Sequence, residues 1–207
     1  MEEVPQLDGV YRAASPDEIA KSYDAWAEDY DADMALLGYR HPAICLALVT
    51  RHLPRGAEPV LDAGAGTGLV GEWLQLVGYL TVEALDISPG MLEVARRKGV
   101  YTRLHEAALG GQLPFEDGHF AAAISAGVFT TGHVGAEGLD ELLRVVRPGG
   151  VLVLTVKDEL WHGGFKTRLA DLQSQGLVRT VEETPSYVSM PGRPKTVPSR
   201  GVVLSVQ

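Results

Sequence analysis

Residues 60–68 of this 207-residue chain read VLDAGAGTG, a short apolar run that leads into a loop with glycine at every second position. Glycine is needed where a chain turns tightly, approaches a ligand closely or packs a helix against a strand. Beyond the loop, apolar side chains recur at helical spacing. We therefore predict a β-strand, a ligand-binding glycine loop and a helix whose inner side carries Leu69, Val70, Trp73, Leu74 and Val77.

The alternation of strand and helix continues along the chain. Further strands are expected over 79–87, 101–107, 120–125 and 151–156. The last of these is continuously apolar, which is typical of a strand covered by helices on both faces. Two more strands, 177–183 and 201–206, follow each other without a helix and should pair antiparallel. We predict an α/β fold with a doubly wound, mostly parallel, seven-stranded sheet that ends in an antiparallel hairpin.

Capping signals and apolar spacing locate the other helices. Ser88-Pro89 should open a helix that ends in three cations, Arg96, Arg97 and Lys98, before Gly99. A later helix should carry Leu139, Leu142, Leu143 and Val146 and stop at residues 148–150, which read PGG. A last helix is marked by Phe165, Leu169 and Leu172.

Asp86 ends the second predicted strand, 18 residues after Gly68. A carboxylate at about this distance from a glycine loop accepts hydrogen bonds from ribose hydroxyls. The NAD fingerprint spaces its last glycine one residue further, and Asp62 beside the loop would repel a pyrophosphate. Asp62 would attract a ligand with an ammonium and a sulfonium. S-adenosylmethionine has both cations and a ribose, so we expect it as the cofactor.

Residues 15–18, SPDE, combine an N-cap, a proline at the first helical position and a capping box. On the helix that they begin, Ile19, Tyr23, Trp26 and Tyr30 recur at spacings of four, three and four. These side chains are predicted to share one face that covers a core. The acids of the same segment, Asp24, Glu28 and Asp31, are predicted to face solvent.

The chain is acidic at one end only. Lys plus Arg number 18 and Asp plus Glu 27, a net charge of −9, and residues 1–33 hold 10 acids and 2 bases of that total. This balance disfavours broad contact with nucleic acid. The composition, 45% hydrophobic and 22% charged, is that of an ordinary globular domain.

The single cysteine, Cys45, excludes an internal disulfide and a cysteine-based zinc site, so a cytoplasmic protein is expected. The six histidines show no metal-ligand spacing, and we expect no metal. No apolar run approaches the roughly 20 residues of a membrane span, and the first residues lack the features of a signal peptide. We expect a soluble, unprocessed protein that does not bind membranes.

Together these motifs resemble the class I S-adenosylmethionine-dependent methyltransferases over roughly residues 15–207. The resemblance rests on residues 60–68, on LDISPGML at 85–92, on LPF at 113–115 and on RPGG at 147–150. A narrower resemblance, to the Williams-Beuren-region methyltransferase-like proteins, rests on YDAWAEDYD at 23–31, LGYR at 37–40, FTTGH at 129–133 and ELW at 159–161. The resemblance to methyltransferases implies one methyltransferase domain over 1–207, with an N-terminal helical lid at 1–45 and a Rossmann-like core at 58–207.

The superfamily resemblance also implies site residues by position. Many relatives carry an acid after the third strand, where this chain has Ala107, Ala108 and Leu109, so adenine should be recognised through the backbone. The positions carried over are Gly64, Ala65 and Gly66 along the methionine part, Asp86 at the ribose, Ile87 and Met91 on the adenine face, Ala108 and Leu109 at the adenine edge, and Ser125 and Ala126 near the sulfonium.

A segment before the first strand often closes over the cofactor in this superfamily. Tyr23, Trp26 and Tyr30 would then form the lid, with tyrosine faces toward the sulfonium, or else they pack in a core. Arg40 is a candidate partner for the methionine carboxylate, and the alternative is an exposed surface arginine. Residues 187–199 either form a mobile surface excursion or shape an acceptor pocket with Trp161 and Phe165.

A methyl acceptor that arrives protonated needs a general base. His133, after the fourth strand, is the candidate, and the alternative is a loop histidine bonded to backbone or water. We predict methyl transfer to an unidentified small-molecule acceptor, with S-adenosylhomocysteine as product, by a monomer or weak homodimer. The alternatives are a methyltransferase that acts on a protein partner and an S-adenosylmethionine-binding protein with little turnover.

Overall fold

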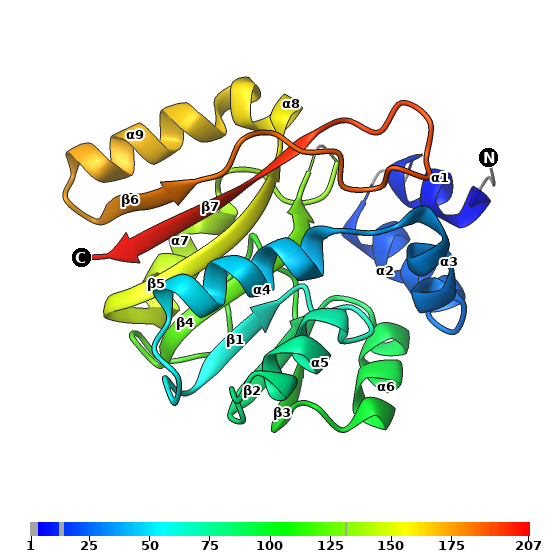
Figure 1. The fold of residues 1–207 in the computed structure, drawn as a ribbon, viewed down its shortest axis with the longest axis horizontal. Helices are drawn as coiled ribbons and strands as arrows, with labels where there is room; N and C mark the ends of the chain where they lie inside the picture. The colour runs from blue at the N-terminus through cyan, green and yellow to red at the C-terminus, as the bar shows by residue number, and fades with distance from the viewer. Residues whose placement is uncertain (1–3, 13–14, 131) are drawn as a thin grey trace.

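The computed structural model describes residues 4–12, 15–130 and 132–207, and within these ranges seven strands form one sheet (Figure 1). Their order is β3-β2-β1-β4-β5-β7-β6. The first five strands pair in parallel, and β7 runs antiparallel to both β5 and β6, as predicted. The strands are β1 Val60–Ala63, β2 Val82–Asp86, β3 Arg103–Glu106, β4 Phe120–Phe129, β5 Val146–Lys157, β6 Val178–Glu183 and β7 Ser199–Val206.

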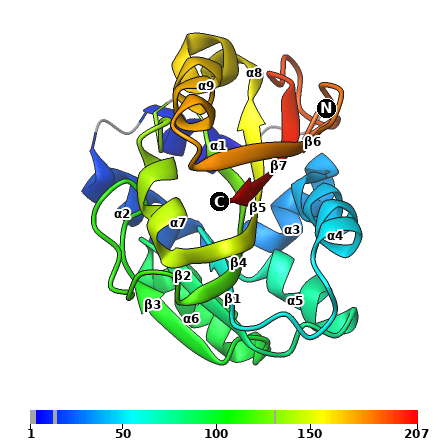
Figure 2. The same cartoon turned by 90° about the vertical axis from the view of Figure 1, so that its left-hand side faces the viewer.

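Helices cover both faces of the sheet (Figure 2). One face is covered by α4 (His41–His52), α5 (Leu69–Leu76) and α6 (Pro89–Lys98). The other is covered by α7 (Gly138–Val145) and α9 (Lys166–Ser174), and the short α8 (Asp158–Leu160) and π-helical turn η1 (Trp161–Phe165) lead into α9. This double covering explains why the central strands are apolar on both sides.

The capping signals locate the helices correctly. The Ser15 hydroxyl accepts a hydrogen bond from the Glu18 N–H at 3.3 Å, and the Ser88 hydroxyl accepts one from the Met91 N–H at 3.0 Å. Gly99 ends α6 in the left-handed conformation, with φ of 68°. These ends depend on local backbone chemistry, which the sequence displays directly.

Two details of the predicted helices are wrong. Trp73, predicted on the inner side of α5, is 46% exposed, while Val70 and Leu74 are buried. Val146 is the first residue of β5 and not part of α7, because it pairs with Phe120 of β4. Strand pairing therefore extends β5 backward across the PGG sequence that was expected to end the helix.

Three helices, α1 (Pro5–Arg12), α2 (Pro16–Trp26) and α3 (Tyr30–Leu37), lie beyond the carboxyl ends of the central strands (Figure 1). The prediction of one helix from Ile19 through Tyr30 is wrong, because α2 ends at Trp26 and α3 begins at Tyr30. The chain turns between them, yet the rings of Tyr23, Trp26 and Tyr30 remain in contact with one another.

The acids of this segment contact α6 and still reach solvent as predicted, since Asp24 is exposed and the side chains of Glu28 and Asp31 are 74% and 37% exposed. Asp24 Oδ1 accepts hydrogen bonds from the Ser88 hydroxyl at 2.6 Å and from the Gly90 N–H at 2.8 Å. A carboxylate at this position also stabilises the positive end of the α6 dipole. Two ion pairs add to the contact, Glu28 with Arg97 at 2.6 Å and Asp31 with Lys98 at 2.6 Å. The acidic segment is therefore bound to the core by charge complementarity.

Candidate active site

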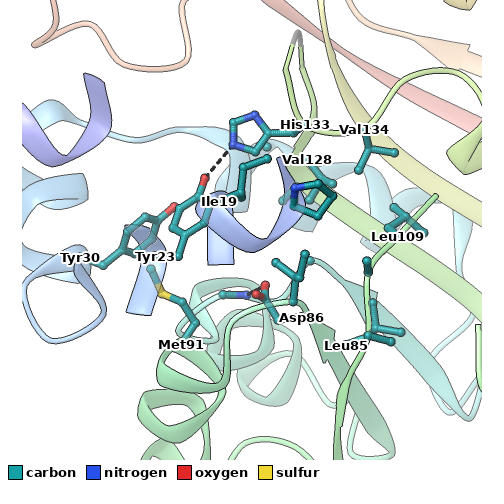
Figure 3. A pocket seen from close by; sticks show the side chains of 18 of the residues that line it. Ile19, Tyr23, Tyr30, Leu85, Asp86, Met91, Leu109, Val128, His133 and Val134 are labelled. Atoms are coloured by element: carbon teal, nitrogen blue, oxygen red, sulfur yellow. Dashed lines mark hydrogen bonds between the residues drawn. The ribbon is translucent and has the colours of Figure 1, made fainter. Parts of the chain in front are cut away.

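A cavity of about 830 Å³, counting the part open to solvent, lies between the carboxyl ends of β1, β2 and β4 and the helices α2 and α3 (Figure 3). The glycine loop and Asp86 form its floor, and Tyr23 and Tyr30 form its roof. Its side walls are mostly apolar, which is usual for a small-molecule site. They include Ile19, Leu85, Ile87, Met91, Ala107, Ala108, Leu109, Ala126, Val128 and Val134.

The glycine loop brings bare backbone to the cavity. Gly64 has φ of 81°, and a Cβ atom there would lie 2.2 Å from Cγ2 of Val128, so no larger residue fits. Gly66 has φ of 54°, and a Cβ there would meet no atom within 4 Å. The space beside Gly66 is part of the cavity, and a ligand can therefore approach the loop closely.

Asp86 is held in position by the loop that it faces. Its two carboxylate oxygens accept hydrogen bonds from the Gly66 N–H at 2.8 Å and from the Ser88 N–H at 2.9 Å. Burial raises the pKa of this carboxyl, and the backbone donors act in the opposite direction. A carboxylate oriented in this way has lone pairs left to accept from the two hydroxyls of a ribose.

The charges around the cavity suit a cationic ligand. Among the described residues that line it, Asp86 is the one carboxylate, and neither lysine nor arginine is present. A pyrophosphate would find no countercharge here, whereas an ammonium and a sulfonium would meet Asp86 and aromatic faces. The apolar walls accept an adenine ring, so the residues present fit S-adenosylmethionine.

The roof is aromatic and neutral. Burial raises the pKa of both Tyr23 and Tyr30 well above its usual range, so both phenols keep their protons. The two rings lie edge to face with centroids 6.3 Å apart. The Tyr23 hydroxyl is 3.3 Å from Nε2 of His133, which brings the predicted base to the roof of the cavity (Figure 3).

Eleven of the predicted site residues line this cavity. They are Tyr23, Tyr30, Gly64, Gly66, Asp86, Ile87, Met91, Ala108, Leu109, Ala126 and His133. Two others do not belong to it. Trp26 is 1% exposed and donates from Nε1 to Asp33 at 2.7 Å within the packed N-terminal cluster. Arg40 is exposed and donates to the Val188 carbonyl at 3.4 Å, so its prediction as a partner for the methionine carboxylate is corrected.

Three more predicted residues lie behind the cavity wall. Ala65 packs against Leu92, and the Ser125 hydroxyl donates to the Ala63 carbonyl at 2.8 Å. Asp62 is fully buried, and burial raises its pKa to about 7, although the Tyr101 hydroxyl donates to it at 2.6 Å. Its side chain is on the α5 side of β1. Asp62 therefore does not line the cavity and is not placed to attract the ligand directly.

A second cavity, of about 440 Å³ counting its open part, adjoins the first. Both are lined by Tyr23, Tyr30, Tyr39 and Gly127. A Cβ at Gly127, where φ is 80°, would lie 2.2 Å from the Tyr39 hydroxyl, so a glycine is required at this shared wall. The polar residues of the second cavity include Tyr11, His41, Thr130, Thr155, Lys157 and Ser189. None of them was predicted as a site residue, although Thr130 lies in the FTTGH sequence and Ser189 in the 187–199 segment.

Residues 187–199 close the second cavity from outside through Ser189 and Met190. This agrees with the expectation that the segment shapes a pocket wall. Trp161 and Phe165, expected beside it, instead pack in the core under α9. Thr131, part of the FTTGH sequence, lies outside the described residues.

The comparisons with known proteins agree with this site. A family model described as "Methyltransferase domain" matches residues 61–154. Methyltransferase-like protein 27 of Homo sapiens is 39% identical over 173 residues, which cover 80% of this chain and 70% of the relative. The chain belongs to the methyltransferase family.

Other matches describe this methyltransferase further. The demethylmenaquinone methyltransferase of Clavibacter sepedonicus is 36% identical over 67% of this chain, but the match spans only 58% of that relative. A solved TehB-like SAM-dependent methyltransferase from Corynebacterium glutamicum, 21% identical, has the same fold with a TM-score of 0.64, over 88% of this chain and 99% of that one. The methyltransferase is S-adenosylmethionine-dependent, and the resemblance noted in the sequence is confirmed.

Two further findings describe what this methyltransferase lacks in residues 4–12, 15–130 and 132–207. No group of three or more histidine, cysteine, aspartate or glutamate side chains there could hold a metal ion. No helix in these ranges is long and apolar enough to cross a bilayer.

Proposed function

We propose that the protein transfers a methyl group to a small-molecule acceptor, with the cofactor in the first cavity and the acceptor in the second. The observation that carries this proposal is the wall that the two cavities share, at Tyr23, Tyr30, Tyr39 and Gly127. An acceptor in the second cavity would meet the reactive carbon at this wall.

The residues act mainly by positioning. Bound S-adenosylmethionine supplies a methyl group already activated by a sulfonium, so proximity and alignment can provide most of the rate. Asp86 binds the ribose hydroxyls, and the backbone at Gly64 and Gly66 supports the methionine part. Tyr23 and Tyr30 cover the sulfonium and exclude water. The helices α1–α3 serve as the lid of a single domain.

The name of one relative, demethylmenaquinone methyltransferase, supports a small acceptor. Another relative is named malonyl-[acyl-carrier protein] O-methyltransferase, and the acyl group in that name is carried on a protein. The setting that we propose is the reducing cytoplasm, since Cys45 is free and buried.

A labelled methyl donor offered with metabolite pools and, separately, with size-fractionated protein tests the acceptor class. Label in protein alone would favour a protein partner, and no label in either would favour a binding protein with little turnover.

The cofactor assignment is tested by calorimetric titration. The wild-type protein should bind S-adenosylhomocysteine and not NAD. In the Asp86→Asn variant the affinity should fall by roughly tenfold to a hundredfold, since hydrogen bonds to a charged group contribute about 1.5–3 kcal/mol. Asp117→Asn is the control, because the side chain of Asp117 is 81% exposed and lies in the turn before β4. Preference for NAD, or unchanged affinity in Asp86→Asn, would contradict the assignment.

His133 is proposed as the base that removes a proton from the acceptor. Its Nε2 atom, 3.3 Å from the Tyr23 hydroxyl, is at the roof of the cofactor cavity, and the His133 ring also contacts Tyr11, which lines the second cavity. The His133→Asn variant should transfer label at least a hundredfold more slowly than wild type, in line with roughly 10²–10⁴-fold contributions of positioned bases. Its affinity for S-adenosylhomocysteine should change little. A transfer rate equal to that of wild type would exclude the base role.

A further inference from the structure

The second cavity contains buried hydroxyl groups without partners. Thr130 is 4% exposed and Ser189 is fully buried, and neither hydroxyl oxygen has a hydrogen-bond partner among the described residues. Both residues line the cavity. A buried hydroxyl without a partner is costly, so such groups usually meet a water or a ligand.

Lys157 brings a positive charge to the same cavity. It is the last residue of β5, and its ammonium group donates to the Tyr11 hydroxyl at 2.8 Å and lies 4.2 Å from the centroid of that ring. Asp158, the next residue in the chain, and Asp8, on the same helix as Tyr11, are both paired with arginines. Asp158 pairs with Arg200 at 2.8 Å, and Asp8 pairs with Arg193. Lys157 therefore forms no ion pair with the described carboxylates.

The rest of the cavity leaves this charge uncompensated. His41 lines it too, and burial together with the nearby Lys157 lowers the pKa of His41 to about 3, so the imidazole is neutral. Its Nδ1 atom is 2.7 Å from the Tyr187 hydroxyl. No aspartate or glutamate is among the described lining residues. The cavity thus presents one cation and a set of hydroxyl donors to whatever enters it.

We infer that the second cavity binds a small organic carboxylate, with the carboxylate group held by Lys157 and by the hydroxyls of Tyr11, Thr130 and Ser189. An ammonium and several hydroxyl donors match the acceptor oxygens of a carboxylate. The methyl acceptor is therefore an acidic small molecule. This inference rests on the proposed function, because it names the substrate class of the same active site.

The second cavity adjoins the first one at the shared wall but is distinct from it. Lys157, Thr130 and Ser189 line only the second cavity. The carboxylate that they hold thus belongs to the acceptor, and the methionine carboxylate of the cofactor is not their ligand. This distinction allows the cofactor and the acceptor to be tested separately.

The experiment measures binding of a panel of carboxylates to the wild-type protein saturated with S-adenosylhomocysteine. Acetate, propionate, benzoate and phenylacetate are each compared with the corresponding neutral amide by calorimetry. At least one carboxylate should bind roughly tenfold or more tightly than its amide, the factor expected for a hydrogen bond to a charged group. If no carboxylate is preferred over its amide, the inference is overturned.

Variants then assign the preference to its residues. Lys157→Met keeps the length of the side chain and removes the charge, and it should abolish the preference for the carboxylate. Thr130→Val keeps the volume and should weaken carboxylate binding severalfold. Lys166→Met is the matched control, because Lys166 is exposed on α9 and lines neither cavity. The control should behave like wild type.

Affinity for S-adenosylhomocysteine separates this inference from the proposed function. Lys157→Met should bind it as wild type does. A parallel loss of that affinity in a folded variant would show that Lys157 serves the cofactor, and the inference would fail while the proposed function stood. If the wild-type protein did not bind S-adenosylhomocysteine, the proposed function itself would fail.

Discussion

At the scale of single residues, two carboxylates at the ends of neighbouring strands have different roles. Asp86 faces the cofactor cavity, and its two oxygens are oriented by backbone donors. Asp62, in register with Ala84 two residues before Asp86, is fully buried and lines neither cavity. Its Oδ1 atom has no hydrogen-bond partner in the described chain. Only one of these carboxylates is thus available to the ligand.

The buried Asp62 predicts how stability changes with pH. Its pKa is about 7 in the folded chain, against about 3.9 for an unfolded aspartate. Between these values the folded chain binds more protons, so the free energy of unfolding falls as the pH rises from about 4 to 7. In Asp62→Asn this contribution is absent. Relative to wild type, the variant should gain up to about 4 kcal/mol across the window.

Denaturant unfolding at several pH values between 4 and 8 measures this difference. His41 also titrates differently in the folded and unfolded chains, but it does so in both proteins and cancels in the comparison. Wild-type and variant curves that stay parallel across the window would show that Asp62 is ionised in the folded protein. The buried carboxyl would then need a partner outside the described contacts.

At the scale of elements, the contact between α2 and α6 positions the roof of the cofactor cavity. Asp24 accepts from the first turn of α6, and a Cβ on Gly90 would lie 2.9 Å from the Cα of Asp24. Tyr23, beside Asp24, reaches over the cavity. Close packing of the two helices therefore determines where the aromatic roof lies.

Removing this contact should loosen the roof. In Asp24→Ala, two hydrogen bonds to a charged acceptor are lost, and α2 should exchange its amide hydrogens at least tenfold faster than in wild type. Affinity for S-adenosylhomocysteine should fall severalfold, because part of the binding free energy then orders the roof. Hydrogen exchange followed by mass spectrometry measures the first effect and calorimetry the second.

Asp29→Ala is the control for this variant. Asp29 lies on the same segment, is exposed and makes no side-chain cap hydrogen bond to α3. Its exchange and affinity should match those of wild type. Equal exchange of α2 in Asp24→Ala and wild type would show that the aromatic packing alone holds the roof in place.

At the scale of the whole molecule, the acidity of the N-terminal segment is structural. Residues 1–33 hold 10 acids and 2 bases, and the acids Asp24, Glu28 and Asp31 contact α6. The cations Arg97 and Lys98 at the end of α6, predicted to interact with the helix dipole, also hold this segment. The charge asymmetry of the chain thus joins the N-terminal segment to the core.

The sequence by itself determined the sheet, the helix ends and the floor of the cofactor cavity. Helix caps, apolar periodicity and the glycine loop are local signals, and parallel strands place the loop and Asp86 at one edge of the sheet. For this reason eleven of the predicted site residues line the cavity. Trp26 and Arg40 do not, because Trp26 packs in the N-terminal cluster and donates to Asp33, and Arg40 lies exposed at the beginning of α4.

Only the tertiary structure decided the second cavity. Its residues come from α1, α2 and α3, from the beginning of α4, from the ends of β4 and β5 and from the segment before β7. Lys157 and Tyr11, which touch there, are 146 positions apart in the chain. No local sequence pattern identifies such residues, because their burial and their contacts arise only when distant segments pack together. The floor of the first cavity follows from local rules of strand and loop, whereas the second cavity depends on contacts between distant segments.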